Sequence, residues 1–143
     1  MYNNDVLLLT VAASEGSGLT PVQLQKALFL IGESKLPGLP VDYYQFIPYN
    51  YGPFQSDIYT DADELSAEGH LAQISVPGRP WSIYQTTSPG QERARQIESE
   101  CQPALASHVR DLVEWVKSLS FSELLRAIYA QYPEFRRNSV FQG

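Results

Sequence analysis

The sequence has few residues of the kinds that carry disulfides, metals or membrane anchors. It contains one cysteine, Cys101, and two histidines among 143 residues. One cysteine cannot build an intramolecular disulfide framework or a cysteine-based zinc site, which suits a reducing compartment such as the cytoplasm. The apolar stretch 6–13 is too short to span a bilayer, and it follows Asn3, Asn4 and Asp5 instead of lysine or arginine. We therefore expect neither a signal peptide nor a transmembrane segment.

The sequence also lacks the spacings that are typical of catalytic and cofactor sites. His70 and His108 lie 38 residues apart, which is not a metal-ligand spacing. Cys101 lies near Glu98 and Glu100, whose negative charges raise the pKa of a thiol instead of activating it. There is no glycine-rich phosphate loop and no Gly-x-Ser-x-Gly elbow. We predict no catalytic residues, no metal site and no cofactor, and a protein that is not an enzyme.

Basic residues are scarce as well. Ten Lys and Arg oppose sixteen Asp and Glu, the net charge is −6, and no basic residue lies between Lys35 and Arg79. This charge repels phosphate backbones and anionic membranes, so we expect no membrane partner and disfavour nucleic acid. The alternative is that nucleic acid is contacted by Lys26 and by the hairpin-tip residues Arg79 and Trp81.

Apolar residues, by contrast, are abundant enough at 43% of the chain to bury one core. Apolar spacing and capping residues at Thr20, Ser56, Ser88 and Ser120 predict helical segments. They cover about 6–14, 21–34, 57–68, 89–101, 109–116 and 121–132. Extended runs at 71–76 and 81–86 flank Pro77-Gly78-Arg79-Pro80, which predicts a β-hairpin. Pro48 limits any earlier strand to a short edge piece.

This order of elements predicts an α+β, mostly helical fold. It is typical of a winged-helix-like three-helix core with a small antiparallel hairpin, here followed by additional C-terminal helices. We find no internal repeat and no linker long enough to divide the chain. We therefore expect a single domain over 1–143, with the core and wing in 1–87 and the extra helices in 88–143.

Aromatic residues gather in one stretch. Residues 43–59 hold seven Tyr and Phe, with charges only at the edges, at Asp42 and Asp57. Tyr and Phe dominate the hot spots of protein interfaces, although alternate members of such a run can also complete a core. We predict a Gly-Pro turn within this stretch and assign partner binding to Tyr49, Asn50, Tyr51, Gly52, Pro53 and Phe54.

The predicted third helix is acidic and has no basic residue. Its carboxylates are Asp57, Asp61, Asp63, Glu64 and Glu68. Two interpretations stay open: a solvated outer face, or a surface that steers a basic protein partner. In the second interpretation Asp61 and Glu64 belong to the partner-binding residues.

A resemblance to known families rests on a few short segments. Leu24-Gln25-Lys26-Ala27-Leu28-Phe29-Leu30, then Tyr51-Gly52-Pro53-Phe54, Ile58-Tyr59, Leu65 and Gly69, resembles the SocA-like or Panacea domain of bacterial and phage antitoxins. The ending 128–139 resembles the YwgA-like, phage-associated proteins of unknown function. The first resemblance covers about residues 19–71. It implies a non-catalytic protein that neutralises a toxin or acts as an adaptor.

Two other functions stay open from the residues themselves. One is a transcription regulator of winged-helix type that binds DNA through its wing. The other is a homo-oligomeric structural component, in which the aromatic stretch and the helices at 109–116 and 124–129 form the subunit interface.

Overall fold

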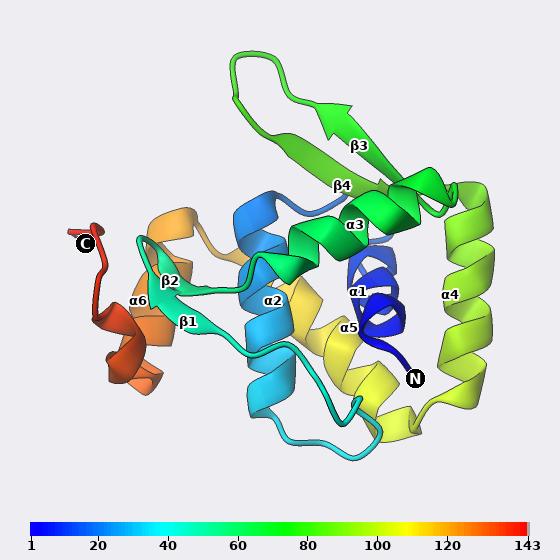
Figure 1. The fold of residues 1–143 in the computed structure, drawn as a ribbon, viewed down its shortest axis with the longest axis horizontal. Helices are drawn as coiled ribbons and strands as arrows, with labels where there is room; N and C mark the ends of the chain where they lie inside the picture. Colours follow the sequence, from blue (N-terminus) through cyan, green and yellow to red (C-terminus); the bar gives the residue numbers. More distant parts are fainter. Residues whose placement is uncertain (143) are drawn as a thin grey trace.

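The computed structural model describes residues 1–142 and has a mostly helical α+β fold, as the sequence predicts (Figure 1). Three helices and an antiparallel hairpin are followed by further helices, and a second, smaller hairpin precedes the third helix. The elements in chain order are α1 (Asn3–Ala12), α2 (Pro21–Glu33), β1 (Ile47–Tyr49), β2 (Gly52–Phe54), α3 (Asp57–Ala67), β3 (Leu71–Ser75), β4 (Ser82–Thr86), α4 (Ser88–Glu100), α5 (Pro103–Ser118), α6 (Phe121–Gln131) and the 3₁₀ helix η1 (Pro133–Arg136).

Helix α1 is the centre of the larger part of the core. Its residues 6–11 are all buried, and α2, α3, α4, α5 and β4 pack around it. A helix that is apolar on every side is stable only inside a protein, which explains this position. The helix begins at Asn3, three residues before the predicted start, and the carboxylate of Asp5 accepts the N–H of Tyr2 at 2.9 Å.

A second part of the core joins α2, α5 and α6. It contains Ala27 and Phe29 of α2, Val116 of α5, and Leu124 and Ile128 of α6. The apolar faces of α5 and α6 are thus buried inside the chain. Their buried residues are not available for the subunit interface that the homo-oligomeric alternative predicts, whereas Trp115 of α5 is exposed.

Helix starts follow the predicted capping pattern at two positions out of four. Thr20 and Ser120 open α2 and α6 with capping boxes. The prediction that Ser88 caps α4 is wrong by one residue, because Thr87 is the residue whose hydroxyl accepts the N–H of Gly90 at 3.0 Å. At α3 the side chain of Ser56 makes no capping hydrogen bond.

The aromatic stretch forms the smaller hairpin. Strands β1 and β2 are antiparallel and pair Ile47 with Phe54 and Tyr49 with Gly52. The prediction of a turn at Gly52-Pro53 is wrong, because these residues form strand β2 and the chain reverses just before them. Gly52 has a φ of +86° and is buried against Tyr129. Glycine adopts this backbone conformation without the strain that a side chain adds.

The second hairpin lies where the sequence predicts a β-hairpin. β3 and β4 are antiparallel and pair from Leu71 with Thr86 to Ser75 with Ser82. The backbone of Leu19 exchanges hydrogen bonds of 3.0 and 2.9 Å with that of Tyr84, which fastens β4 to the segment before α2. The rest of the hairpin extends beyond the helices at the top of Figure 1.

Candidate functional site

Exposed apolar side chains gather on one surface, made by β1, the turn after it, the start of α6 and the C-terminal segment. We call this the aromatic surface, and it consists of Ile47, Tyr49, Tyr51, Phe121 and Val140, each between 43% and 57% exposed. The ring of Phe121 lies 5.4 Å from that of Tyr51 and 6.0 Å from that of Phe141. Tyr51, Phe121 and Phe141 therefore meet on this surface, although they lie far apart in sequence.

The C-terminal segment is held against the hairpin by hydrogen bonds. The N–H of Val140 donates to the carbonyl of Asn50 at 2.9 Å, and the hydroxyl of Ser139 donates to the same carbonyl at 3.3 Å. The hydroxyl of Tyr129 lies 2.6 Å from that of Ser139, and the guanidinium of Arg136 lies 5.1 Å from the centre of the Tyr129 ring. The backbone that carries the exposed rings is thus held in place by hydrogen bonds.

Buried polar side chains of α2 hold the other side of the hairpin. The ammonium of Lys26 donates to the carbonyl of Pro53 at 2.9 Å, and the side-chain amide of Gln25 exchanges two hydrogen bonds of 2.9 Å with the backbone of Gln55. Lys26 is only 3% exposed, and burial lowers its pKa to about 8. The prediction that Lys26 contacts nucleic acid is therefore wrong, because its side chain positions the hairpin inside the fold.

The predicted partner-binding residues divide into two groups in the structure. Tyr49 and Tyr51 are exposed and their rings belong to the aromatic surface. Gly52 and Pro53 are buried beneath it, and Phe54 is half-buried and stacks on Tyr49 with ring centres 4.8 Å apart. The backbone carbonyl of Asn50 is occupied by the C-terminal segment. Asn50 is itself exposed, whereas Gly52, Pro53 and Phe54 support the surface from beneath.

Asp61 and Glu64 are not brought to the aromatic surface. Asp61 accepts the hydroxyl proton of Tyr44 at 2.5 Å, and Glu64 accepts the side-chain N–H of Asn4 at 3.3 Å. Burial raises the pKa of Asp61, and the hydrogen bond from Tyr44 opposes that rise. In Figure 1 α3 runs away from the β1–β2 hairpin. Both carboxylates thus have contacts within the fold, as the solvated-face interpretation allows.

Arg79 and Trp81 lie at the exposed end of the wing. The backbone N–H of Arg79 closes the turn on the carbonyl of Val76 at 3.1 Å, and its side chain is exposed. Lys26 is buried elsewhere in α2, so the three residues predicted as nucleic-acid contacts do not form one surface. Two further arginines lie in ion pairs, Arg93 with Asp5 at 3.5 Å and Arg95 with Glu92 at 2.7 Å.

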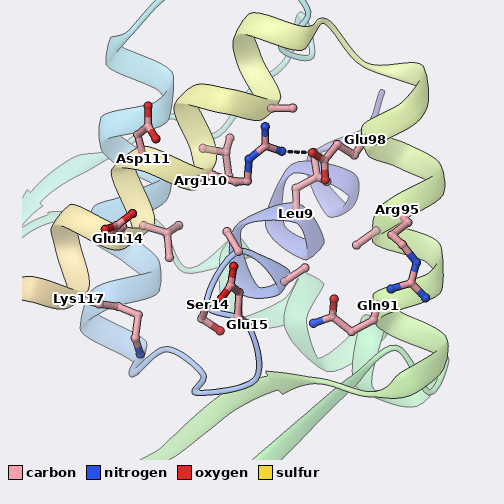
Figure 2. Close-up of a pocket in the computed structure, with 16 residues that line it drawn as sticks. Leu9, Ser14, Glu15, Gln91, Arg95, Glu98, Arg110, Asp111, Glu114 and Lys117 are labelled. Carbon is pink, nitrogen blue, oxygen red and sulfur yellow. Dashed lines mark hydrogen bonds and ion pairs between the residues drawn. The ribbon is translucent and has the colours of Figure 1, made fainter.

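A cleft of about 710 Å³ separates α4 from α5 (Figure 2). Its floor is apolar, with Leu9 of α1 and Val109 of α5 among the lining residues, and its rims carry charges of both signs. Figure 2 shows the ion pair of Arg110 with Glu98 reaching across it. Lys117, on the same rim, donates to the carbonyl of Gly18. The cleft thus combines an apolar floor with an ion pair across its rims.

The remaining chemical groups differ little from the sequence-based description. The pKa of Cys101 is raised as predicted, but the main cause is burial and not the neighbouring carboxylates. Within residues 1–142 no three His, Cys, Asp or Glu side chains group together in a way that could hold a metal ion. In the same residues, no helix has the length and apolar character needed to cross a membrane.

Sequence reasoning missed Phe121 and the C-terminal segment as parts of the surface. Phe121 follows the predicted cap Ser120, and the apolar face expected of that helix begins only at Leu124. The sequence did contain a signal for Phe121, namely a large aromatic residue outside the apolar face of its helix. No protein-family model matches the chain, and no curated protein matches it. The resemblance to the SocA-like, Panacea and YwgA-like families therefore stays a prediction carried by the quoted residues.

Proposed function

We propose that this chain is a non-enzymatic protein-interaction module, an antitoxin or adaptor of SocA/Panacea type, which binds one protein partner through the aromatic surface. The observation that carries the proposal is the contact between the exposed rings of Tyr51 and Phe121, beside a C-terminal segment that is hydrogen-bonded to the hairpin. A contiguous exposed apolar patch is typical of an interaction site. Rigid aromatic side chains lose little conformational entropy when a partner covers them.

Charge supports the choice of partner chemistry. Residues 1–118 contain seven Lys and Arg and fourteen Asp and Glu, whereas residues 119–142 contain three arginines and two glutamates. Two members of the aromatic surface, Phe121 and Val140, thus belong to a stretch in which three arginines exceed two glutamates by one. Tyrosine and arginine are enriched in interface hot spots. We therefore expect the partner to present an apolar segment flanked by carboxylates.

Affinity capture with native mass spectrometry tests this function. The bait is the whole chain, and the test variant is the double substitution Tyr51→Ala with Phe121→Ala. The matched control is Ile74→Ala with Trp81→Ala, which removes two comparably exposed apolar side chains from the wing. We expect one stoichiometric protein to elute with the unchanged chain and with the control, and to be lost with the test variant.

Three results contradict the proposal. Retention of the partner by the test variant places binding elsewhere. Elution of nucleic acid in place of a protein supports the transcription-regulator alternative, and elution of the chain alone as an oligomer supports the structural one. Circular dichroism of both variants ensures that a lost partner does not reflect a lost fold.

A further inference from the structure

A second, smaller hollow lies on another part of the molecule, beside the end of α2. Its volume is about 240 Å³, and it lies between α2, the segment that leads to β1, and η1. We call it the aromatic pocket. Aromatic rings from all three segments line it, namely Phe29, Tyr43, Tyr44, Phe46 and Phe135. This hollow has no part in the aromatic surface of the proposed function.

The rings of the pocket stand at steep angles to one another. Phe29 meets Phe46 and Phe135 with ring centres 5.4 and 4.8 Å apart, and Tyr44 meets Tyr43 and Phe46 at 5.3 and 6.5 Å. The four interplanar angles lie between 65° and 79°. Each of these rings thus covers part of a neighbour's face with its edge, and the remaining ring surface borders the hollow.

Local contacts hold two of these walls in place. The hydroxyl of Tyr43 donates to the carbonyl of Leu28 at 2.6 Å, and that of Tyr44 donates to Asp61. Gly32 leaves the room for the Tyr43 ring, because a side chain there begins 2.7 Å from a ring carbon. Both phenol hydroxyls are thus hydrogen-bonded within the fold, and the aromatic rings line the pocket.

The only charged residue among those that line the pocket is an acid, Glu33. Its carboxylate also acts on the neighbouring Tyr132, whose pKa is raised first by burial and then by Glu33 and Glu134. Tyr132 packs on Phe29 with ring centres 5.0 Å apart, so this negative potential lies at the pocket. The described residues that line it include no lysine or arginine.

We propose that the aromatic pocket binds a small organic cation of the alkylated ammonium class. Aromatic faces attract such a cation through their quadrupoles, and its weakly hydrated methyl groups are easily transferred to an apolar hollow. The carboxylate of Glu33 balances the charge. A neutral molecule of the same shape gains the apolar contact but neither the cation–π attraction nor the ion pairing.

The direct test is an NMR titration of the whole isotope-labelled chain, in which the chemical shift of the Gly32 amide is monitored. Choline is the probe, and 3,3-dimethylbutan-1-ol, its uncharged analogue of the same shape, is the control. We expect saturable shifts with choline and binding of the alcohol weaker by about tenfold. Equal binding of both compounds overturns the proposal in favour of a merely apolar crevice. An absence of saturable shifts with choline overturns it outright.

A pair of exposed carboxylates supplies the matched variants. Glu33→Gln removes the charge at the pocket, and Glu68→Gln removes one at the end of α3, so both alter the net charge equally. We expect Glu33→Gln to weaken choline binding about fivefold and Glu68→Gln to leave it unchanged. Equal effects of the two variants place the ligand elsewhere. Loss of choline binding in Phe135→Leu, with the fold checked by its amide spectrum, completes the assignment, and undiminished binding contradicts it.

Discussion

The two hairpins of this protein are both antiparallel, but they contact different helices. β1–β2 has strands of three residues and packs against α2, α6 and η1, whereas β3–β4 has strands of five and packs against α1, α2, α3 and α4. Leu71 is buried at the base of the longer hairpin, whereas residues 77–81 at its tip are exposed and extend beyond the helices in Figure 1. The number of ladder pairs therefore does not decide how much of a hairpin is held by other elements.

What decides it is the set of side chains that reach the hairpin from elsewhere. The shorter hairpin receives Lys26 and Gln25 from one side and Val140 from the other. The longer hairpin is joined to α3 by the side chain of Gln73, which donates to Asp63 at 2.8 Å, and nearer its tip its side chains are exposed. A surface of exposed rings needs the first kind of support, because only a fixed backbone presents them without an ordering cost.

The largest expected effect is on the anchoring of the shorter hairpin. Phe29→Ala removes a buried ring that packs on Phe46, Tyr132 and Phe135. We expect the free energy of unfolding to fall by about 3–5 kcal/mol in urea denaturation. Ile74→Ala in the longer hairpin is the control and should cost less than about 0.5 kcal/mol. Equal losses of unfolding free energy in the two variants would show that the hairpins do not differ in this way.

The buried Lys26 is expected to have the next largest effect, and the effect depends on pH. The folded protein releases this proton near pH 8, whereas an unfolded lysine holds it to about 10.5. Between these values the unfolded state binds more protons, so the free energy of unfolding rises with pH. The contribution amounts to about 2 kcal/mol between roughly pH 7 and pH 9.5. Below pH 8 the penalty for the buried charge is fully present.

The matched measurement is urea denaturation of the unchanged chain and of Lys26→Met at the two pH values. Lys117, whose pKa burial also lowers, is present in both proteins and cancels in the difference. We expect the rise to be smaller by the stated amount in the variant. The same rise in both proteins would show that Lys26 titrates as an ordinary exposed lysine.

The base of the longer hairpin depends on Thr87. Its hydroxyl accepts the N–H of Gly90 and donates to the carbonyl of Gly69, so it caps α4 and closes the hairpin at once. We expect Thr87→Ala to lower the free energy of unfolding by about 1–2 kcal/mol. Ser88→Ala, one residue further on, should change it by less than about 0.5 kcal/mol. The reverse order would restore Ser88 as the cap.

The smallest effect is expected at the tip of the longer hairpin. Arg79→Ala removes an exposed side chain, and we expect a change in stability of less than about 0.5 kcal/mol. Retention of the chain on a duplex-DNA column at low salt should also be unchanged, because a single exposed arginine on an acidic protein adds one phosphate contact at most. A clear loss of retention would support the transcription-regulator alternative.

Local signals in the sequence were sufficient for most of the elements. Thr20 with Gln23 and Ser120 with Glu123 identified two helix starts correctly, because a capping box depends on residues only three positions apart. The capping predictions for Ser56 and Ser88 were wrong, although serine is also the cap at Ser120. A neighbouring side chain or residue supplies the capping contact in each case, from Gln55 and Thr87.

Lys26 and the C-terminal segment show why the candidate site was only partly predictable. A lysine in an amphipathic helix is read as exposed, and its burial depends on Pro53, which lies 27 residues away in sequence. The contact of Val140 with Asn50 spans most of the chain. Periodicity carries no information about such partners, because it describes one element at a time.

The mostly helical fold class, the hairpin of β3 and β4, the acidic third helix and the aromatic character of the stretch around Tyr49 and Tyr51 could all be predicted from the sequence, because each is a property of neighbouring residues. Only the tertiary structure decided which rings stay exposed, which carboxylates of α3 are engaged, and how Phe29, Tyr43 and Phe135 come to line one pocket. Those outcomes depend on long-range packing, in which side chains compete for burial against elements that the local sequence does not contain.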